Sequence, residues 1–138
     1  MLRGAPRSHV PAADPAPDPR QALGQDGESA ACAALRTRGY TILARRFRIA
    51  HGEIDIVARD GDTIVFVEVK TRRASAYGGG AAAVTWRKQR RIVRVAEAFL
   101  ARGRLHHLPC RFDVVSVEWT KVEGAPRTEI IRGAFDAT

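Results

Sequence analysis

Asp55, Glu68 and Lys70 are the residues whose types and spacing most clearly suggest chemistry. Glu68 and Lys70 are two positions apart in an apolar, β-branched run, so their side chains would share one face of a strand. Asp55 precedes Glu68 by thirteen residues, which allows a hairpin to place both carboxylates on neighbouring strands. Paired carboxylates suit Mg²⁺, and a nearby lysine could orient a water or stabilise charge on a phosphate. These are the parts needed to hydrolyse a phosphodiester bond.

A simpler interpretation of these three residues stays open. A charge at the end of a buried strand is costly unless it is paired, solvated or bound to a metal. An ion pair between Glu68 and Lys70 would meet that requirement, with Asp55 as a bystander.

Two β-rich segments, residues 53–59 and 63–70, must carry these side chains. They are separated by Asp60-Gly61-Asp62, a sequence that favours a hairpin. The second segment is largely apolar on both faces, which is typical of a central strand covered on both sides. Strict alternation in the first segment predicts that Ile54 and Ile56 share one face.

A third carboxylate lies on a predicted helix at residues 25–38, which Gly39 would close with a left-handed cap. Glu28 is at the N-terminal end of the apolar stripe of this helix. Its carboxylate could cap the helix and benefit from the helix dipole. Alternatively, it could point into a site between the helix and the sheet.

A second helix, predicted at residues 84–102 and ended by Gly103, carries a dense set of basic residues. One arc of this helix holds Arg87, Arg90, Arg91 and Arg94. Such an arc could contact the phosphates of a nucleic acid, or it could be a solvated face. Lys88 projects from the apolar arc instead, so it either snorkels or reaches the pocket that holds Glu68 and Lys70.

The positive charge of the chain is concentrated around these elements. The 138 residues carry a formal net charge of +8. Eleven of the 23 Lys and Arg residues, but only one acid, Glu97, lie between residues 69 and 111. A polyanion such as nucleic acid is therefore the expected partner.

The composition excludes several other classes of protein. Hydrophobic residues make up 45% and charged residues 28%, which is typical of a soluble globular domain. No apolar run approaches the roughly 18–20 residues that cross a bilayer, and the N-terminus lacks the apolar core of a signal peptide. We therefore expect a cytoplasmic protein with no membrane partner. Two cysteines, Cys32 and Cys110, make neither a disulfide framework nor a metal site alone.

The chain is expected to contain one domain. Residues 1–22 are rich in Pro and Ala and should form a disordered leader. Residues 23–119 would form the domain, and residues 120–138 would be a tail that packs against it or hangs free. Further strands are predicted at residues 40–48 and 111–119. The order is then α-β-β-β-α-β, an α/β fold with a mixed central sheet flanked by helices.

The motifs, taken in order, resemble a known family. Asp55 followed by Glu68-Val69-Lys70 resembles the PD-(D/E)xK nuclease signature of the restriction-endonuclease-like fold. The whole set more closely resembles the YraN-like family of bacterial proteins. That set comprises Gly27-Glu28, Gly52-Glu53-Ile54-Asp55, residues 65–72 and the closing strand at residues 111–115. The resemblance covers residues 23–119, and archaeal Holliday-junction resolvases are relatives in fold.

The resemblance implies a site as well as a fold. Glu28, Asp55 and Glu68 would bind Mg²⁺ or Mn²⁺, Lys70 would be the catalytic lysine, and Glu53 would support the metal ligands or replace one. The side chains expected to bind nucleic acid are Arg72, Arg87, Lys88, Arg90, Arg91 and Arg94. Position 46 carries Arg where the family commonly has Asn.

The activity expected from this site is metal-dependent endonuclease cleavage of DNA, branched or single-stranded. Cutting both strands would require two sites, as in a homodimer. Two alternatives stay open: an RNA nuclease, and a non-catalytic nucleic-acid-binding protein of a repair or processing assembly.

Overall fold

The structure, a computed structural model, describes residues 19–73, 84–119 and 126–137. Its elements in chain order are α1 (Pro19–Thr37), β1 (Thr41–Ile49), β2 (Gly52–Asp60), β3 (Thr63–Arg73), α2 (Trp86–Gly103), β4 (Cys110–Trp119) and β5 (Arg127–Phe135). The order α-β-β-β-α-β-β confirms the predicted α/β class and adds one strand at the C-terminal end.

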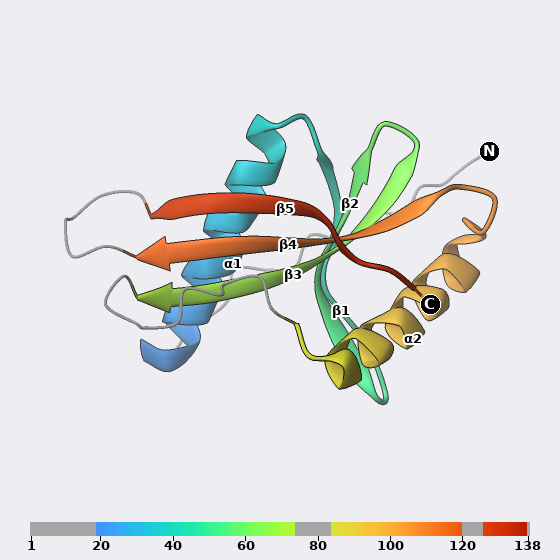
Figure 1. Cartoon of the computed structure of the whole chain (residues 1–138), viewed down its shortest axis with the longest axis horizontal. Helices are drawn as coiled ribbons and strands as arrows, with labels where there is room; N and C mark the ends of the chain where they lie inside the picture. Colours follow the sequence, from blue (N-terminus) through green and yellow to red (C-terminus); the bar gives the residue numbers. More distant parts are fainter. Residues whose placement is uncertain (1–18, 74–83, 120–125, 138) are drawn as a thin grey trace, which may run out of the picture.

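The five strands form one mixed sheet in the order β1-β2-β3-β4-β5 (Figure 1). β1, β2 and β3 are antiparallel neighbours, β3 and β4 are parallel, and β5 is antiparallel to β4. Parallel neighbours need a crossover connection, which here contains α2. The predicted hairpin between β2 and β3 is confirmed, because Asp60 pairs with Thr63 and Gly61 adopts a φ of 62°.

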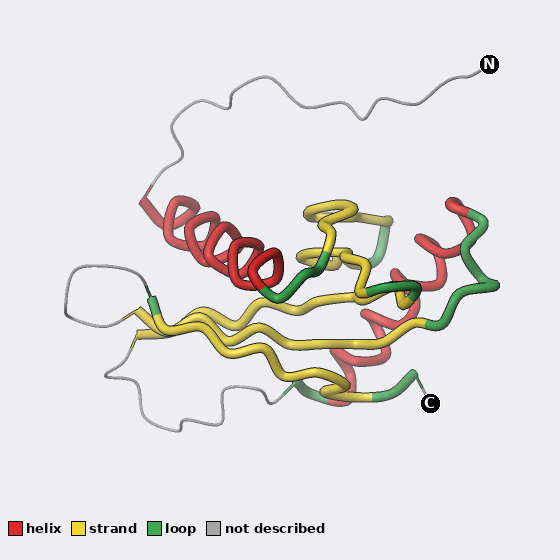
Figure 2. The backbone as a smooth tube through the Cα atoms, turned by 90° about the horizontal axis from the view of Figure 1, so that it is seen from above, coloured by secondary structure: helices red, strands yellow, loops and turns green. Residues whose placement is uncertain are grey.

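The helices cover opposite faces of the sheet (Figure 2). Alternate residues of β3 enter two separate cores, since successive strand side chains point to opposite faces. Ile64 and Phe66 pack in the core beneath α2, whereas Val65 and Val67 pack in the core beneath α1. The prediction that this strand is central and covered on both sides is confirmed.

The predicted alternation in β2 is wrong at one position. Ile54 packs in the α2 core together with Val57, while Ile56 packs in the α1 core. The pairing of β2 with β3 begins only at Ile56, opposite Val67. The residues of β2 before Ile56 are not paired with β3, so their orientation can differ from that of the paired part. Strict alternation of side chains between the two faces therefore does not extend from Ile56 back to Ile54.

The helix ends follow specific local interactions. Gly39 closes α1 with a φ of 92°, as predicted. Thr85 caps the N-terminus of α2, where its side chain accepts a hydrogen bond from the backbone N–H of Lys88 at 3.2 Å. The helix expected at residues 84–102 is found at residues 86–103, so Gly103 is its last residue, and the left-handed residue that follows it is Arg104.

Both ends of the domain contain more regular structure than expected from the sequence. α1 begins at Pro19 and so includes residues 19–22, which the sequence placed in the leader; residues 1–18 lie outside the described residues. Residues 127–135, within the predicted tail, pair with β4 as β5. No helix in the described residues is long and apolar enough to cross a membrane.

Candidate metal and nucleic-acid site

The site begins where β2 and β3 separate. The ladder between them stops at Ile56 and Val67, so Asp55 and Glu68 are the next residues along each strand. The backbone N–H of Val69 donates a hydrogen bond to Oδ2 of Asp55 at 2.8 Å. The Asp55 carboxylate thus replaces the missing ladder contact and is held against the strand that carries Glu68.

Glu68 is buried, with 6% of its surface exposed, and its charge is balanced from α2. Oε2 of Glu68 lies 2.5 Å from Nζ of Lys88. The ion pair at Glu68 therefore comes from the helix rather than from Lys70 on its own strand. The sequence had left open whether Lys88 snorkels to solvent, and the structure places it in the pocket with Glu68.

Burial and a neighbouring charge strongly affect the ionisation of Asp55. Burial, together with the negative charge of Glu68, raises the pKa of Asp55 to about 7. The Val69 N–H opposes this shift because it stabilises the ionised carboxylate, and the charge of Glu28 adds to it. A cation between the two oxygen groups would relieve this repulsion.

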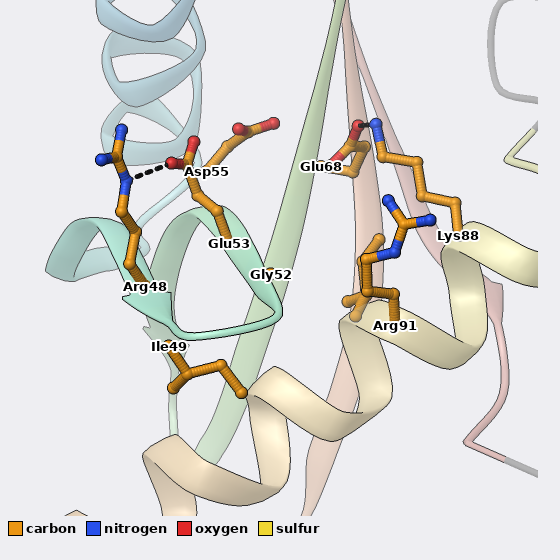
Figure 3. Close-up of a pocket in the computed structure, with 9 residues that line it drawn as sticks. Arg48, Ile49, Gly52, Glu53, Asp55, Glu68, Lys88 and Arg91 are labelled. Carbon is orange, nitrogen blue, oxygen red and sulfur yellow. Dashed lines mark hydrogen bonds and ion pairs between the residues drawn. The ribbon is translucent and has the colours of Figure 1, made fainter.

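Asp55 and Glu68 line a pocket of about 480 Å³ between β2, β3 and α2 (Figure 3). The Glu53–Arg48 ion pair, at 2.6 Å, lies on one side of the pocket and the Glu68–Lys88 pair on the other, with Asp55 between them in this view. Arg91 also lines the pocket. The pocket thus combines acidic groups with cationic groups that could face a phosphate.

Glu28 is held by two arginines from the middle of β1. Its side chain is buried, and it pairs with Arg45 at 3.4 Å and with Arg46 at 3.2 Å. Arg46 has a φ of 55°, a left-handed conformation in which Asn is several-fold enriched over most residues. Neither arginine was expected from the sequence to bind Glu28, and Arg46 does so from a backbone conformation that no sequence pattern indicates.

The residues of this pocket fit a divalent cation through two carboxylates rather than three. The described parts of the chain contain no group of three or more His, Cys, Asp or Glu side chains placed to hold one metal ion. Glu28 is therefore not grouped with Asp55 and Glu68 in this conformation. Mg²⁺ commonly uses one or two carboxylates and retains several waters, so Asp55 and Glu68 provide a sufficient set of hard oxygen ligands.

Lys70 and Arg72 follow Glu68 on the same face of β3 by strand alternation. Both are partly buried, and β4 residues Ser116 and Glu118 lie opposite them in the register. Nε of Arg72 is buried without a hydrogen-bond partner among the described residues. Glu53, the predicted supporting residue, lines the same pocket as Asp55.

Four of the five arginines of α2 line a second pocket of about 400 Å³, beside the first: Arg87, Arg90, Arg91 and Arg94. Arg91 lines both pockets, so the arginine arc is continuous with the carboxylate site. Two aromatic side chains, His51 and Trp86, complete the second pocket. Neither residue was expected from the sequence to line a site, although the position of Trp86 at the start of the arginine-rich helix was a usable signal.

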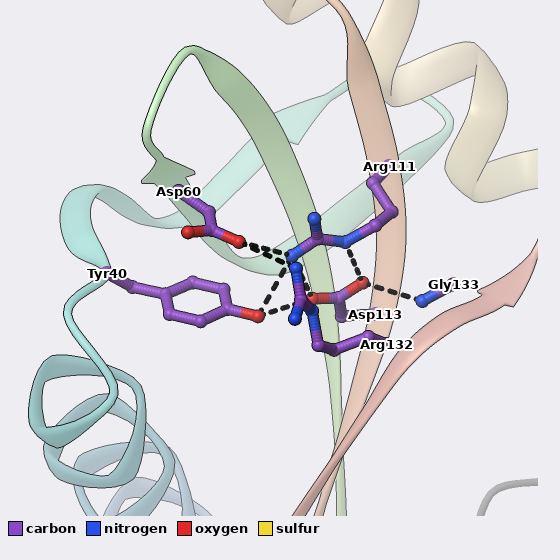
Figure 4. Close-up of polar contacts among 6 residues, drawn as sticks. All are labelled: Tyr40, Asp60, Arg111, Asp113, Arg132 and Gly133. Atoms are coloured by element: carbon purple, nitrogen blue, oxygen red, sulfur yellow. Dashed lines mark hydrogen bonds and ion pairs between the residues drawn. The ribbon is translucent and has the colours of Figure 1, made fainter.

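A separate buried cluster stabilises the far end of the sheet (Figure 4). Asp113, which is fully buried, accepts hydrogen bonds from Arg111 at 2.8 Å, from the Tyr40 hydroxyl at 3.0 Å and from the Gly133 N–H at 2.9 Å. Arg111 also pairs with Asp60 at 3.0 Å. The hydrogen bonds of Asp113 join β4 to Tyr40 and to β5, so we assign this buried acid a structural role.

The mixed sheet, the helices on its two faces and the order of elements define a restriction-endonuclease-like fold. Residues 27–117 match a family described as "Uncharacterised protein family UPF0102". The chain belongs to this family, which is the YraN-like family expected from its motifs.

Curated relatives match over nearly their whole length. A UPF0102 protein of Symbiobacterium thermophilum is 50% identical over 115 residues, covering 83% of this chain and 97% of the relative. One from Geotalea uraniireducens is 47% identical over 116 residues, covering 84% and 91%. One from Pseudomonas aeruginosa is 44% identical over 115 residues, covering 83% and 92%.

Proposed function

We propose that this protein is a metal-dependent endonuclease that hydrolyses phosphodiester bonds in nucleic acid. The observation that carries the proposal is the carboxylate pair at the point where β2 and β3 separate. Asp55 is held there by the Val69 N–H, its pKa is raised to about 7 by burial and by Glu68, and both acids face a pocket with cationic walls. A carboxylate whose pKa is raised this far by burial and by a specific neighbouring charge is characteristic of functional sites.

Each side chain has a distinct role in this proposal. Asp55 and Glu68 would hold Mg²⁺ or Mn²⁺, which would supply positive charge where negative charge develops on the phosphate. Lys70, on the face of Glu68, would attract a phosphate oxygen or orient the attacking water. Lys88 pairs with Glu68, and its ammonium would contact the phosphate when a cation takes its place at Glu68.

The substrate is recognised in this proposal through its backbone. Arg87, Arg91 and Arg94 present guanidinium groups around one pocket, where they would bind phosphates without reading sequence. The proposed substrate is DNA rather than RNA, and the proposed location of the protein is the cytoplasm. Cleavage of both strands would require two sites, as in a homodimer. Arg72 would extend this surface along β3.

One observation favours a second candidate, a protein that binds nucleic acid without cutting it. Glu28 and Glu68 are both neutralised by basic side chains, and the described residues include no cluster of three potential metal ligands. A domain in that state would retain its basic surface and could act within a repair or processing assembly. A third candidate is a nuclease that uses the same site to cleave RNA.

A cleavage panel separates these candidates. The full chain is incubated with labelled duplex, single-stranded, flapped and four-way DNA and with RNA, each with Mg²⁺, Mn²⁺ or EDTA. The endonuclease proposal predicts products from DNA with Mg²⁺ or Mn²⁺ and none with EDTA. Tight binding without product under every metal would support the binding protein instead, and products from RNA alone would identify the substrate as RNA.

A further inference from the structure

Trp86 is the most exposed large apolar side chain in the described residues. Its indole is 70% exposed at the first position of α2, whereas the next such residue, Leu43, is 42% exposed. A single exposed apolar residue is ordinary, so exposure alone does not identify a binding surface. The surroundings of Trp86 are what make its position informative.

Trp86 lies in a pocket whose other walls are cationic or aromatic. The pocket of about 400 Å³ is lined by His51, Trp86, Arg87, Arg90, Arg91 and Arg94, without an acidic residue. Four guanidinium groups favour an anionic ligand, and phosphate oxygens match their geometry. An indole among phosphate-binding groups suits a ligand that has a flat aromatic part and an anionic part, as a nucleotide does.

The Trp86 ring is supported on one side. The guanidinium of Arg90 lies 5.8 Å from the centre of the indole ring, and it also donates a hydrogen bond to the carbonyl of Ala137 at 3.1 Å. The Thr85 cap fixes the helix turn from which Trp86 projects. Arg90 covers one side of the ring, and Trp86 is 70% exposed. The other face of the indole is therefore open to solvent, and one base could stack on it.

The position of Trp86 relative to the carboxylate pocket restricts the kind of base that could reach it. Arg91 lines both pockets, and Lys88, one turn from Arg91 on the same helix, contacts Glu68. A strand with a phosphate at Glu68 would therefore place a neighbouring nucleotide beside Trp86. A base inside a duplex is already stacked on both faces, so only an unpaired base could occupy this surface.

We propose that Trp86 is a stacking platform for an unpaired base next to the phosphate bound at the carboxylate pocket. The inference rests on the proposed nucleic-acid function and specifies its substrate class, namely strands with single-stranded or unpaired nucleotides near the cleavage position. Arg90 supports the ring, and Arg87 and Arg94 hold the flanking phosphates.

Tryptophan fluorescence tests this proposal without any cleavage. The chain has two tryptophans, so Trp119→Phe leaves Trp86 as the only reporter. This variant is titrated in EDTA with a short oligothymidine, with an abasic strand of equal length and with a blunt duplex. We expect strong quenching by oligothymidine, and at least about fivefold weaker binding of the abasic strand and of the duplex. Equal quenching by the abasic strand would overturn the proposal.

Binding by variants provides a second readout. In the otherwise unchanged chain, Trp86→Ala should weaken oligothymidine binding by about tenfold, and Trp86→Phe should restore much of it. Leu43→Ala, the control for loss of another exposed apolar side chain, should bind as the parent does. Unchanged binding by Trp86→Ala would contradict the proposal, as would quenching by phosphatidylserine vesicles but not by oligothymidine.

The outcomes also separate this inference from the nuclease activity. Base-dependent quenching in a protein that cuts nothing would support the platform and contradict hydrolysis. Cleavage by the parent, with Trp86→Ala binding oligothymidine as tightly as the parent, would support hydrolysis and contradict the platform.

Discussion

The backbone N–H of Val69 donates a hydrogen bond to Oδ2 of Asp55 at 2.8 Å, at the point where the ladder between β2 and β3 ends. This contact places an acid from one strand against the strand that carries Glu68. Asp55 and Glu68 are the first residues beyond the end of this ladder. The separation of the two strands and the position of the carboxylate pair therefore have the same local cause. The function proposed here depends on that juxtaposition, and the pH dependence of stability reports on it.

Asp55→Asn should stabilise the metal-free protein, and more so at high pH. The pKa of Asp55 rises from 3.8 in the unfolded chain to about 7 in the fold, so between about pH 4 and pH 7 only the folded state retains the proton. The wild type therefore loses stability across that interval as pH rises. Asn has no charge and still offers an oxygen to Val69. We expect a gain of about 1–3 kcal/mol at pH 8 and a smaller one at pH 5.

Urea unfolding in EDTA at both pH values measures this difference. Asp62→Asn, at an exposed acid in the hairpin turn, is the control and should change stability equally little at pH 5 and pH 8. An Asp55→Asn effect that does not grow with pH would show that the Asp55 carboxylate is not held in its protonated form.

Lys88→Met should tighten the binding of Mn²⁺. The Lys88 ammonium lies 2.5 Å from Glu68 and would compete for the oxygens that a cation would use. Removing this charge should lower the Kd for Mn²⁺ by about threefold to tenfold in isothermal titration calorimetry. Arg94→Met removes a charge from the same helix away from Glu68 and should leave that Kd nearly unchanged. Weaker Mn²⁺ binding by Lys88→Met would mean that Lys88 supports the metal site instead of competing with it.

Gly27→Ala should destabilise the packing of α1 on β3. A Cβ at Gly27 would overlap Oγ1 of Thr71, so either the Thr71 side chain must change its rotamer or the helix must move away from β3. We expect a loss of about 1–3 kcal/mol in urea unfolding, although alanine is the better helix former. Thr71→Ala removes the obstructing oxygen and should restore most of that loss in the double variant. Failure of this rescue would contradict the close approach as the cause.

The arginine pocket should set the salt dependence of nucleic-acid binding. Replacing Arg87 and Arg94 with Ala removes two pocket-lining charges, which should reduce the slope of log K against log salt by about 1 to 2. Replacing Arg36 and Arg38, two exposed arginines at the end of α1, is the matched control. Fluorescence anisotropy over a salt series measures both slopes. If the control pair changed the slope more, the binding surface would lie near α1.

Local sequence patterns were sufficient to predict much of this fold. The hairpin at Gly61, the two-sided burial of β3 and the glycine that closes α1 follow from turn chemistry and from periods of two and 3.6 residues. The same patterns placed Asp55 near Glu68, and gave Lys88 as a residue that could reach them.

Interactions that depend on tertiary structure could not be predicted in this way. The Asp113 cluster joins Tyr40 and Gly133, which are far apart in sequence. Ile54 departs from alternation because β2 separates from β3, a property of two strands rather than one. The pairing of Glu28 with Arg46 likewise depends on a left-handed backbone conformation that no local pattern indicated.

The most direct test of the central proposal is the single-turnover cleavage of flapped DNA by the wild type and by Glu68→Gln, with Mg²⁺ or Mn²⁺. Glutamine keeps the size of the side chain but weakens its hold on a cation, so the rate should fall at least about 100-fold while binding in EDTA changes by less than about threefold. Glu129→Gln, at an exposed acid on β5, should cut at the wild-type rate. Cleavage by Glu68→Gln at the wild-type rate would contradict the proposed site. Binding without cleavage by the wild type would contradict the proposed reaction.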